Sequence, residues 1–208
     1  MNIEITKQID LSKNDAISSV FGGLYAQQHQ DAYKSFYSLI RNVSPSRILE
    51  IGTAKGGLTQ FLKLCLDDLK LESRIRSYDV KNRKQYKDMR DMGIDVRVEN
   101  IFNENFSSCD QGVIQYIQQL GTTIVLCDGG NKIEEFKLLS KYIKSGDIIL
   151  AHDYAESNEL FDLKIKTIRW NWCEITNDDI LESANINGLE HYMKDEFENV
   201  VWTCRRKV

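Results

Sequence analysis

The sequence predicts an α/β fold, a three-layer sandwich around a mostly parallel sheet, and three observations support it. Short apolar runs alternate with segments of helical periodicity, which is typical of parallel strands joined by right-handed crossovers. The run TTIVLCD (122–128) is almost continuously apolar, as in strands that helices cover on both faces. The run ILEIGTAKGGLT (48–59) leads from apolar residues into glycines, the start of a Rossmann-like cofactor fold.

The first half of the chain supplies three of the strands. Residues 13–43 are expected to be mainly helical, and the turn SPS (44–46) ends them. The following elements are a buried strand at 47–51, a helix at 56–70, a strand at 74–80, a polar helix at 82–92 and a strand at 93–100.

The second half adds four strands, which makes seven in total. A helix at 110–120 precedes the strand at 122–128, and a helix at 131–144 precedes the strand at 148–154. The segments 166–175 and 199–207 are rich in β-formers and alternate in polarity, so we expect an antiparallel pair at the C-terminal edge. We expect a single domain over 1–208, with a helical N-terminal lid (1–45) on a Rossmann-like core (46–208).

Composition limits the possible partners. A formal charge of −4 and a pI near 5.5 argue against a general nucleic-acid binder, which would normally present a basic face. The five cysteines are scattered, never form CxxC and lie mostly in apolar runs, which favours free thiols in a reducing compartment. No signal peptide or membrane-spanning segment is evident, so we expect a cytoplasmic protein.

The acid before the first glycine indicates the cofactor. Glu50 ends an apolar strand, and Gly52, Gly56 and Gly57 follow it. Glycine lets the backbone approach a ligand closely, and a buried carboxylate requires partners. A cationic nucleoside such as S-adenosylmethionine (SAM) supplies them better than an anionic dinucleotide does.

Two further strand ends fit a nucleoside. Asp79 closes the second strand, where it is expected to accept both ribose hydroxyls; the alternative is a solvated aspartate or a helix N-cap. Asn100 closes the third strand and either faces an adenine edge or forms a turn.

Three side chains follow the fourth and fifth strands. Asp128, His152 and Asp153 converge if their strands are neighbours, and two carboxylates with an imidazole suit a divalent cation. The alternatives are that Asp128 caps the next helix and that His152 belongs to the hydrogen-bonded scaffold. His29, in the polar run AQQHQD (26–31), lies either in a lid or at a solvated helix start.

Three tryptophans lie in the late segments. Trp170, Trp172 and Trp202 alternate there, and packing in the core or in an edge-strand cluster is favoured over stacking on a substrate.

These residues resemble the class I SAM-dependent methyltransferases, in particular the metal-dependent O-methyltransferases and the cephalosporin-hydroxylase-like branch. The resemblance runs from about Phe21 to Trp202. It rests on FGGLYAQQHQDAYKSFYSLIRNVSPSRILEIGTAKGG with its E-x-G-x-x-x-G motif, on DIILAHDY, and on WNWCEIT and VVWTCRR.

The resemblance implies roles for single residues. Glu50, Gly52, Thr53 and Gly56 would border the methionine part of SAM. Asp79 would hold the ribose. From their places at strand ends, Asn100 and Asp128 are also expected in the cofactor site. Asp128, His152 and Asp153 would occupy the metal positions, and Asp128 and His152 would be catalytic.

Two departures from the family pattern stand out. His152 replaces an oxygen ligand, which shifts the expected ion from Mg²⁺ toward Mn²⁺, Fe²⁺ or Zn²⁺. Asn131 stands where some members carry a lysine or histidine base, and asparagine cannot accept a proton at neutral pH.

The expected function is SAM-dependent O-methylation of a small hydroxylated acceptor, a sugar or another metabolite. The expected partners include no nucleic acid and no membrane, and assembly into a homo-oligomer stays open. One alternative is a non-catalytic SAM-binding protein with this fold. A second is a nicotinamide-dependent oxidoreductase, which Gly52-x-Ala54-x-x-Gly57 would permit as a variant dinucleotide fingerprint.

Overall fold

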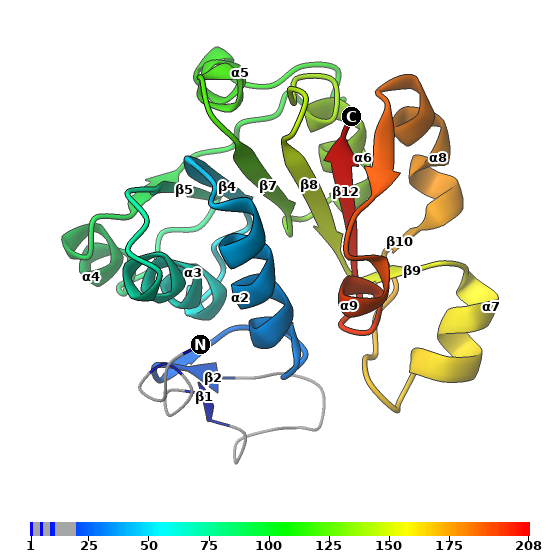
Figure 1. The fold of residues 1–208 in the computed structure, drawn as a ribbon, viewed down its shortest axis with the longest axis horizontal. Helices are drawn as coiled ribbons and strands as arrows, with labels where there is room; N and C mark the ends of the chain where they lie inside the picture. Colours follow the sequence, from blue (N-terminus) through cyan, green and yellow to red (C-terminus); the bar gives the residue numbers. More distant parts are fainter. Residues whose placement is uncertain (2–4, 6–8, 11–19) are drawn as a thin grey trace.

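A central seven-stranded sheet organises the molecule (Figure 1). The structure is a computed structural model that describes residues 1, 5, 9–10 and 20–208. The strand order is β11-β12-β8-β7-β4-β5-β6, and β12 alone runs antiparallel to its neighbours in this sheet. This arrangement confirms the predicted mostly parallel sheet with an antiparallel pair at its C-terminal edge. Its strands are β4 (Arg47–Ile51), β5 (Arg74–Asp79), β6 (Asp95–Val98), β7 (Thr123–Cys127), β8 (Ile148–His152), β11 (Leu189–His191) and β12 (Trp202–Lys207).

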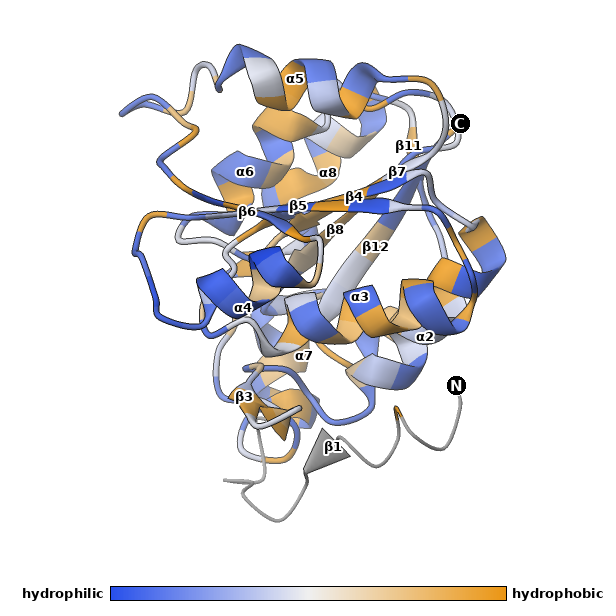
Figure 2. Cartoon of the chain, turned by 90° about the vertical axis from the view of Figure 1, so that its left-hand side faces the viewer, coloured by the Kyte–Doolittle hydropathy of each residue, from blue (hydrophilic) through white to orange (hydrophobic). Residues whose placement is uncertain are grey.

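Helices cover both faces of the sheet and make the three layers (Figure 2). One face carries α2 (Ala32–Val43), α3 (Gly57–Asp68) and α4 (Tyr86–Asp91), and the other carries α5 (Gln111–Gln118), α6 (Lys132–Leu139) and α8 (Asn177–Ile186).

Alternate residues along the strands pack into two separate hydrophobic cores, one on each face of the sheet. Ile48 and Leu126 pack with the α2–α3 side, whereas Leu49 and Val125 pack with the α5–α6 side. Because successive strand side chains point to opposite faces, both faces must be apolar, which explains the continuous apolar runs.

The strand order reverses between β4 and β7. From β4 the chain proceeds outward through β5 to β6, and it then returns to place β7 and β8 on the other side. Ligands in open α/β sheets bind beyond the carboxyl ends of the strands at such a reversal. The loops that begin at Gly52 and Asp128 lie at this point.

The predicted N-terminal helix is wrong for residues 20–31, and residues 13–19 lie outside the described chain. A small antiparallel sheet precedes α2, formed by β1 (Ile9–Asp10), β2 (Val20–Phe21) and β3 (Leu24–Tyr25). Gly22 and Gly23 both adopt positive φ between β2 and β3, the geometry that a two-residue hairpin turn demands. Phe21 is fully buried against Phe61 of α3, so packing reinforces the hairpin.

The predicted strand at 166–175 is also wrong. This region follows α7 (Asn158–Leu160) and a π-helix, η1 (Phe161–Ile165), and it ends in β10 (Ile175–Thr176), which pairs with β9 (Tyr154–Ala155). Thr167 adopts positive φ, which interrupts an extended strand. The edge partner of β12 is instead β11, and α9 (Lys194–Glu198) connects the two.

Two other expectations can be checked in the described part of the chain. All five cysteines are free; three are buried and two are half-buried. No helix there has both the length and the apolar character that crossing a bilayer requires.

Candidate functional site

Two adjoining cavities lie beyond the carboxyl ends of the parallel strands. The larger has a volume of about 620 Å³ and extends from the β4–β7 reversal to the end of β6. The smaller, of about 210 Å³, lies on the side of β8 and the loop 170–174. The cavities have a common wall formed by Gly52, Ala54, Asp128 and Gly129. The two cavities therefore border each other at Asp128.

Gly52 allows the tips of β4 and β7 to approach. Its φ is +96°, and a Cβ at this position would lie 2.1 Å from the carbonyl oxygen of Asp128, so any other residue would collide with the backbone. Thr53 follows it and lines the smaller cavity. Gly56, with φ of +83°, is the N-cap of α3 and lines neither cavity.

Glu50 is buried beneath this turn and lines neither cavity. Its Oε2 accepts hydrogen bonds from the Thr59 hydroxyl at 2.6 Å and from the Ser77 hydroxyl. Burial raises its pKa to about 7; the two hydroxyls oppose this rise, and the Asp128 and Asp79 carboxylates add to it. Protein hydroxyls are thus its partners here, and its contact with the methionine part of a cofactor stays a prediction.

Asp79 ends β5 and lines the larger cavity. Its Oδ2 accepts hydrogen bonds from the backbone N–H of Ala54 at 2.8 Å and from the Tyr86 hydroxyl at 2.9 Å. Its Oδ1 accepts from the N–H of Lys81 at 2.7 Å. The carboxylate therefore ties the glycine turn to β5 and does not cap a helix. Its contact with a ribose stays a prediction.

The far end of the larger cavity is apolar on one side. Asn100 lines it, and the Asn100 Oδ1 accepts from the N–H of Phe102 at 3.1 Å. Ile101, Phe102 and Phe106 lie beside it, with the two phenylalanine rings 5.0 Å apart. The Asn100 side chain thus closes a turn with the backbone two residues ahead, and its contact with an adenine edge stays a prediction.

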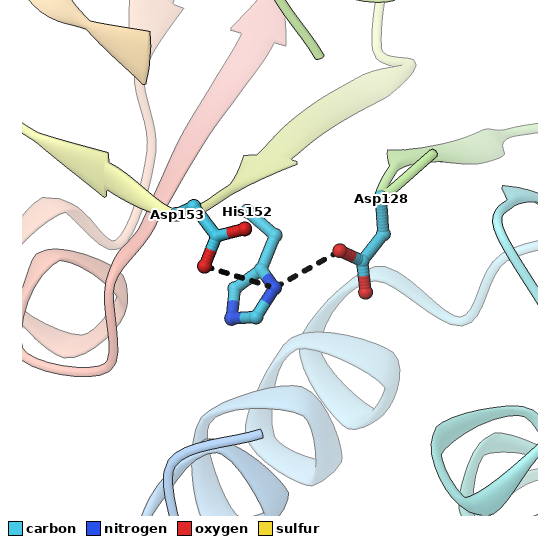
Figure 3. Close-up of side chains that lie close together, drawn as sticks. All are labelled: Asp128, His152 and Asp153. Atoms are coloured by element: carbon cyan, nitrogen blue, oxygen red, sulfur yellow. Dashed lines mark hydrogen bonds and ion pairs between the residues drawn. The ribbon is translucent and has the colours of Figure 1, made fainter. Parts of the chain in front are cut away.

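Asp128 occupies the common wall, and other side chains fix its position. Its Oδ1 lies 2.9 Å from Nδ1 of His152, and its Oδ2 accepts from Nε2 of Gln28 at 3.0 Å. The dashed line between Asp128 and His152 in Figure 3 marks the first of these contacts. Gln28 is fully buried, and its Oε1 in turn accepts from the indole N–H of Trp202 at 2.7 Å. Asp128 is not the cap of α6, because that position belongs to Asn131, whose side chain accepts from Glu134 N–H.

His152 is buried between two indoles. Its ring stacks on Trp202 with centroids 4.7 Å apart and lies 5.2 Å from Trp170. Burial by itself would lower the pKa of the imidazole, but the Asp128 and Asp153 carboxylates outweigh burial and raise it. Its Nε2 points away from both carboxylates (Figure 3) and has no hydrogen-bond partner among the described residues.

Asp153 lies next to His152 in the left-handed region, with φ of +56°. Its Oδ1 is 3.7 Å from Nδ1 of His152 and accepts from the Trp170 indole N–H. Its Oδ2 is 3.0 Å from Nζ of Lys132. The structure therefore brings the three predicted metal ligands together, with one possible ligand atom from each within 4.8 Å of the others.

Lys132 is a residue of this site that the sequence analysis missed. Its side chain is 6% exposed, and its ammonium contacts Asp153, Oε2 of Glu174 at 2.7 Å and the carbonyl oxygen of Gly129 at 3.2 Å. Burial opposes its charge, yet the Asp128 and Asp153 carboxylates and the hydrogen bonds raise its pKa. Lys132 is therefore a permanent cation and not a base at neutral pH.

The tryptophans divide between core and cavity. Trp202 on β12 is buried in the core, which confirms core packing for this residue. Trp170, in the loop before β10, is also buried but lines the smaller cavity. Trp172 is 48% exposed and lines the smaller cavity, so its indole is available to a ligand.

Comparisons with solved structures agree with this architecture. A CmcI structure with SAH matches with a TM-score of 0.63 at 12% identity, over 100% of this chain and 92% of that chain. A CmcI structure with Mg-SAM has the same TM-score and identity, over 100% and 85%. A putative caffeoyl-CoA O-methyltransferase from Staphylococcus aureus matches with a TM-score of 0.52 at 12% identity, over 84% and 82%. The chain thus has the Rossmann-like methyltransferase fold that its sequence predicted.

Sequence comparisons add no further assignment. No protein-family model matches the chain, and no curated protein sequence does.

Proposed function

We propose that this protein is a SAM-dependent methyltransferase that methylates an oxygen of a small hydroxylated acceptor, a sugar or another metabolite. The observation that carries the proposal is the pair of cavities that meet at Asp128. The larger takes the cofactor and the smaller takes the acceptor. In this proposal the two cavities open to each other beside Asp128 when both ligands are bound. Holding the acceptor oxygen, the methyl carbon and the sulfur in line then supplies much of the catalysis of a displacement at carbon.

The polar groups of the larger cavity suit SAM better than a dinucleotide. Asp79 lines this cavity, and its Oδ1, which accepts a single hydrogen bond, is the oxygen proposed for a ribose hydroxyl; Asn100 with Phe102 lies where the base is proposed to bind. At the other end, Asp128 lies beside the glycine turn, and Glu135, whose oxygens accept from the backbone N–H groups of Gly129 and Asn131, lines the same cavity. Acids there attract a sulfonium and an amino group and repel a pyrophosphate.

CmcI, whose structures include SAH and Mg-SAM complexes, has the same fold. That likeness supports the choice of cofactor.

Asp128 and His152 are proposed as the catalytic pair. In the reaction the acceptor oxygen forms a bond to the methyl carbon, the carbon–sulfur bond breaks, and the sulfonium loses its charge. The acceptor hydroxyl loses its proton toward the Asp128 carboxylate, which His152 holds at 2.9 Å. Gln28 holds the other Asp128 oxygen at 3.0 Å, so the carboxylate has a fixed direction when the acceptor arrives.

A divalent cation held by Asp128, His152 and Asp153 stays a proposal. The contacts that these residues already make bear on it. Two carboxylates and an imidazole form a suitable donor set. Most of these donor atoms are, however, already engaged: Lys132 and Trp170 contact the two oxygens of Asp153, and His152 Nδ1 contacts Asp128. His152 Nε2 alone among them has no partner in the described part of the chain. The mechanism above therefore uses no metal-dependent step.

The proposal is tested first by calorimetric titration of the protein with SAM and with NAD. We expect SAM to bind and NAD not to bind; binding of NAD alone would favour the oxidoreductase. Transfer of a labelled methyl group from SAM is then measured over a panel of sugars and hydroxylated metabolites. SAM binding without transfer to any acceptor would favour a non-catalytic SAM-binding protein.

The role of Asp128 is tested by Asp128→Asn. This change keeps the side-chain shape but removes the proton acceptor, and we expect turnover to fall by about 10²-fold or more while SAM still binds. The matched control is Asp91→Asn, because Asp91 is exposed on α4. Equal turnover in both variants would contradict the assigned role.

A further inference from the structure

Lys132 stands among the residues that a divalent cation would need. It lies in the first turn of α6, directly after the N-cap Asn131, and its side chain extends toward the loop after β8. Its ammonium has three oxygen partners, from Asp153, Glu174 and Gly129, at 3.0, 2.7 and 3.2 Å. Three donors therefore meet three acceptors, which is the full hydrogen-bonding capacity of an ammonium group.

The acids around Lys132 explain why a cation is required there. Asp128 and Asp153 approach each other through His152, and Asp153 is 7% exposed. Two carboxylates in such a position are strongly unfavourable without a compensating positive charge. Lys132, only 6% exposed, supplies it from within the chain.

The same contacts disfavour a metal ion. Asp153 has one oxygen in contact with the Trp170 indole N–H and the other with Lys132, so neither oxygen is free of a donor. A divalent ion at this point would also lie close to a buried ammonium, and like charges repel strongly where water is scarce.

We propose that Lys132 is the resident cation of the acceptor cavity and takes the place of a divalent metal ion. The part of this inference that concerns catalysis rests on the proposed function. Glu174, whose side chain is 47% exposed, is the partner that an acceptor oxygen replaces. The ammonium then stabilises negative charge on that oxygen as its proton leaves.

The experiment measures Mn²⁺ binding by electron paramagnetic resonance of the free ion. Five proteins are titrated: wild type, Lys132→Gln, Lys137→Gln, Asp153→Asn and the double variant Lys132→Gln/Asp153→Asn. Gln at position 132 removes the charge but keeps a hydrogen-bond donor for Asp153. Lys137 is the matched control, because it lies on the same helix, is 40% exposed and pairs only with Glu134 among the described acids.

We expect the wild type, Lys137→Gln and Asp153→Asn to leave the Mn²⁺ signal unchanged. We expect Lys132→Gln to lower the free Mn²⁺ signal, with an affinity at least about tenfold above the detection limit that the wild type sets, because a nearby positive charge has been removed. We expect the double variant Lys132→Gln/Asp153→Asn to leave the signal unchanged again. Equal Mn²⁺ binding by the wild type and a folded Lys132→Gln would overturn the proposal.

The wild-type measurement decides the matter even if Lys132→Gln fails to fold. Mn²⁺ that is bound by the wild type and released by Asp153→Asn overturns the proposal directly, and an unchanged signal supports it. Titration of the same samples with SAM separates this inference from the proposed function: a wild type that binds no SAM contradicts the proposed function and leaves the Mn²⁺ result valid.

Discussion

The buried carboxyl group of Glu50 leads to a quantitative prediction for stability. It is 1% exposed, and it accepts hydrogen bonds from Thr59 and Ser77 on a single oxygen. The variant Glu50→Gln keeps an oxygen for both hydroxyls and cannot ionise. A comparison of the two proteins therefore isolates the cost of the buried charge.

The sign of the change in stability with pH follows from the direction of the pKa shift. Burial raises the folded-state pKa of Glu50 from 4.5 to about 7. As the pH rises through 4.5, the unfolded chain ionises first while the folded protein retains its proton. Stability therefore falls between pH 4.5 and 7 and reaches a constant lower level above pH 7.

The magnitude follows from the size of the shift. A shift from 4.5 to about 7 corresponds to about 3 kcal/mol over the whole titration, of which about 2 kcal/mol falls between pH 5 and 8. We expect the wild type to lose this amount of unfolding free energy relative to Glu50→Gln over that interval.

The assay is urea unfolding followed by circular dichroism at pH 5, 6, 7 and 8. Glu72→Gln is the control, because Glu72 is exposed in the loop before β5. The decisive quantity is the difference between wild type and Glu50→Gln in how steeply the unfolding free energy changes with pH. A constant difference in unfolding free energy between the two proteins also contains the effect of the polarity of the new amide. Parallel pH profiles for these two proteins would refute the reasoning.

Three further predictions concern the site. Asp79→Ala should weaken SAM binding about tenfold or more, because it removes the carboxylate that fixes the glycine turn; calorimetry showing the same affinity as the exposed-site control Asp88→Ala would contradict the ribose assignment. Gly52→Ala should lower the unfolding free energy by about 2–4 kcal/mol, because its Cβ would lie 2.1 Å from a carbonyl oxygen; Gly130→Ala, with open space around it, should change it by less than about 0.5 kcal/mol, and equal losses would contradict the steric argument. Dialysis against EDTA should leave methyl transfer unchanged if Lys132 is the cation of the site, and loss of activity that Mn²⁺ restores would count against it.

Much of the fold could be predicted because local pattern and tertiary environment agree. Strands β4, β7 and β8 are buried on both faces, and their continuous apolar runs reflect that burial directly. The errors arose where contacts outweighed local pattern. Alternating polarity at 166–175 indicated a strand, but Trp170 donates to Asp153 and Thr167 has positive φ, so the segment forms a loop. The pair Gly22-Gly23 predicts a hairpin turn. The helical periodicity of the residues that follow this pair led to the prediction of a helix instead.

The sequence by itself determined which residues stand at the ends of the parallel strands. Gly52, Asp79, Asn100 and Asp128 meet at the cavities because the carboxyl ends of neighbouring parallel strands share one edge. Predicting that these residues meet requires only the positions where the strands end, and the hydrophobic pattern of the sequence indicates those positions.

Only the tertiary structure decided what surrounds these residues. Gln28 reaches Asp128 from 100 positions away in the sequence, and Lys132 meets Glu174 across 42 positions. Such contacts depend on how loops and helices pack over the sheet, and no periodicity of the chain encodes that packing. The physical reason is that a buried charge takes its partner from whatever the fold brings within about 3 Å, and sequence distance does not limit that choice.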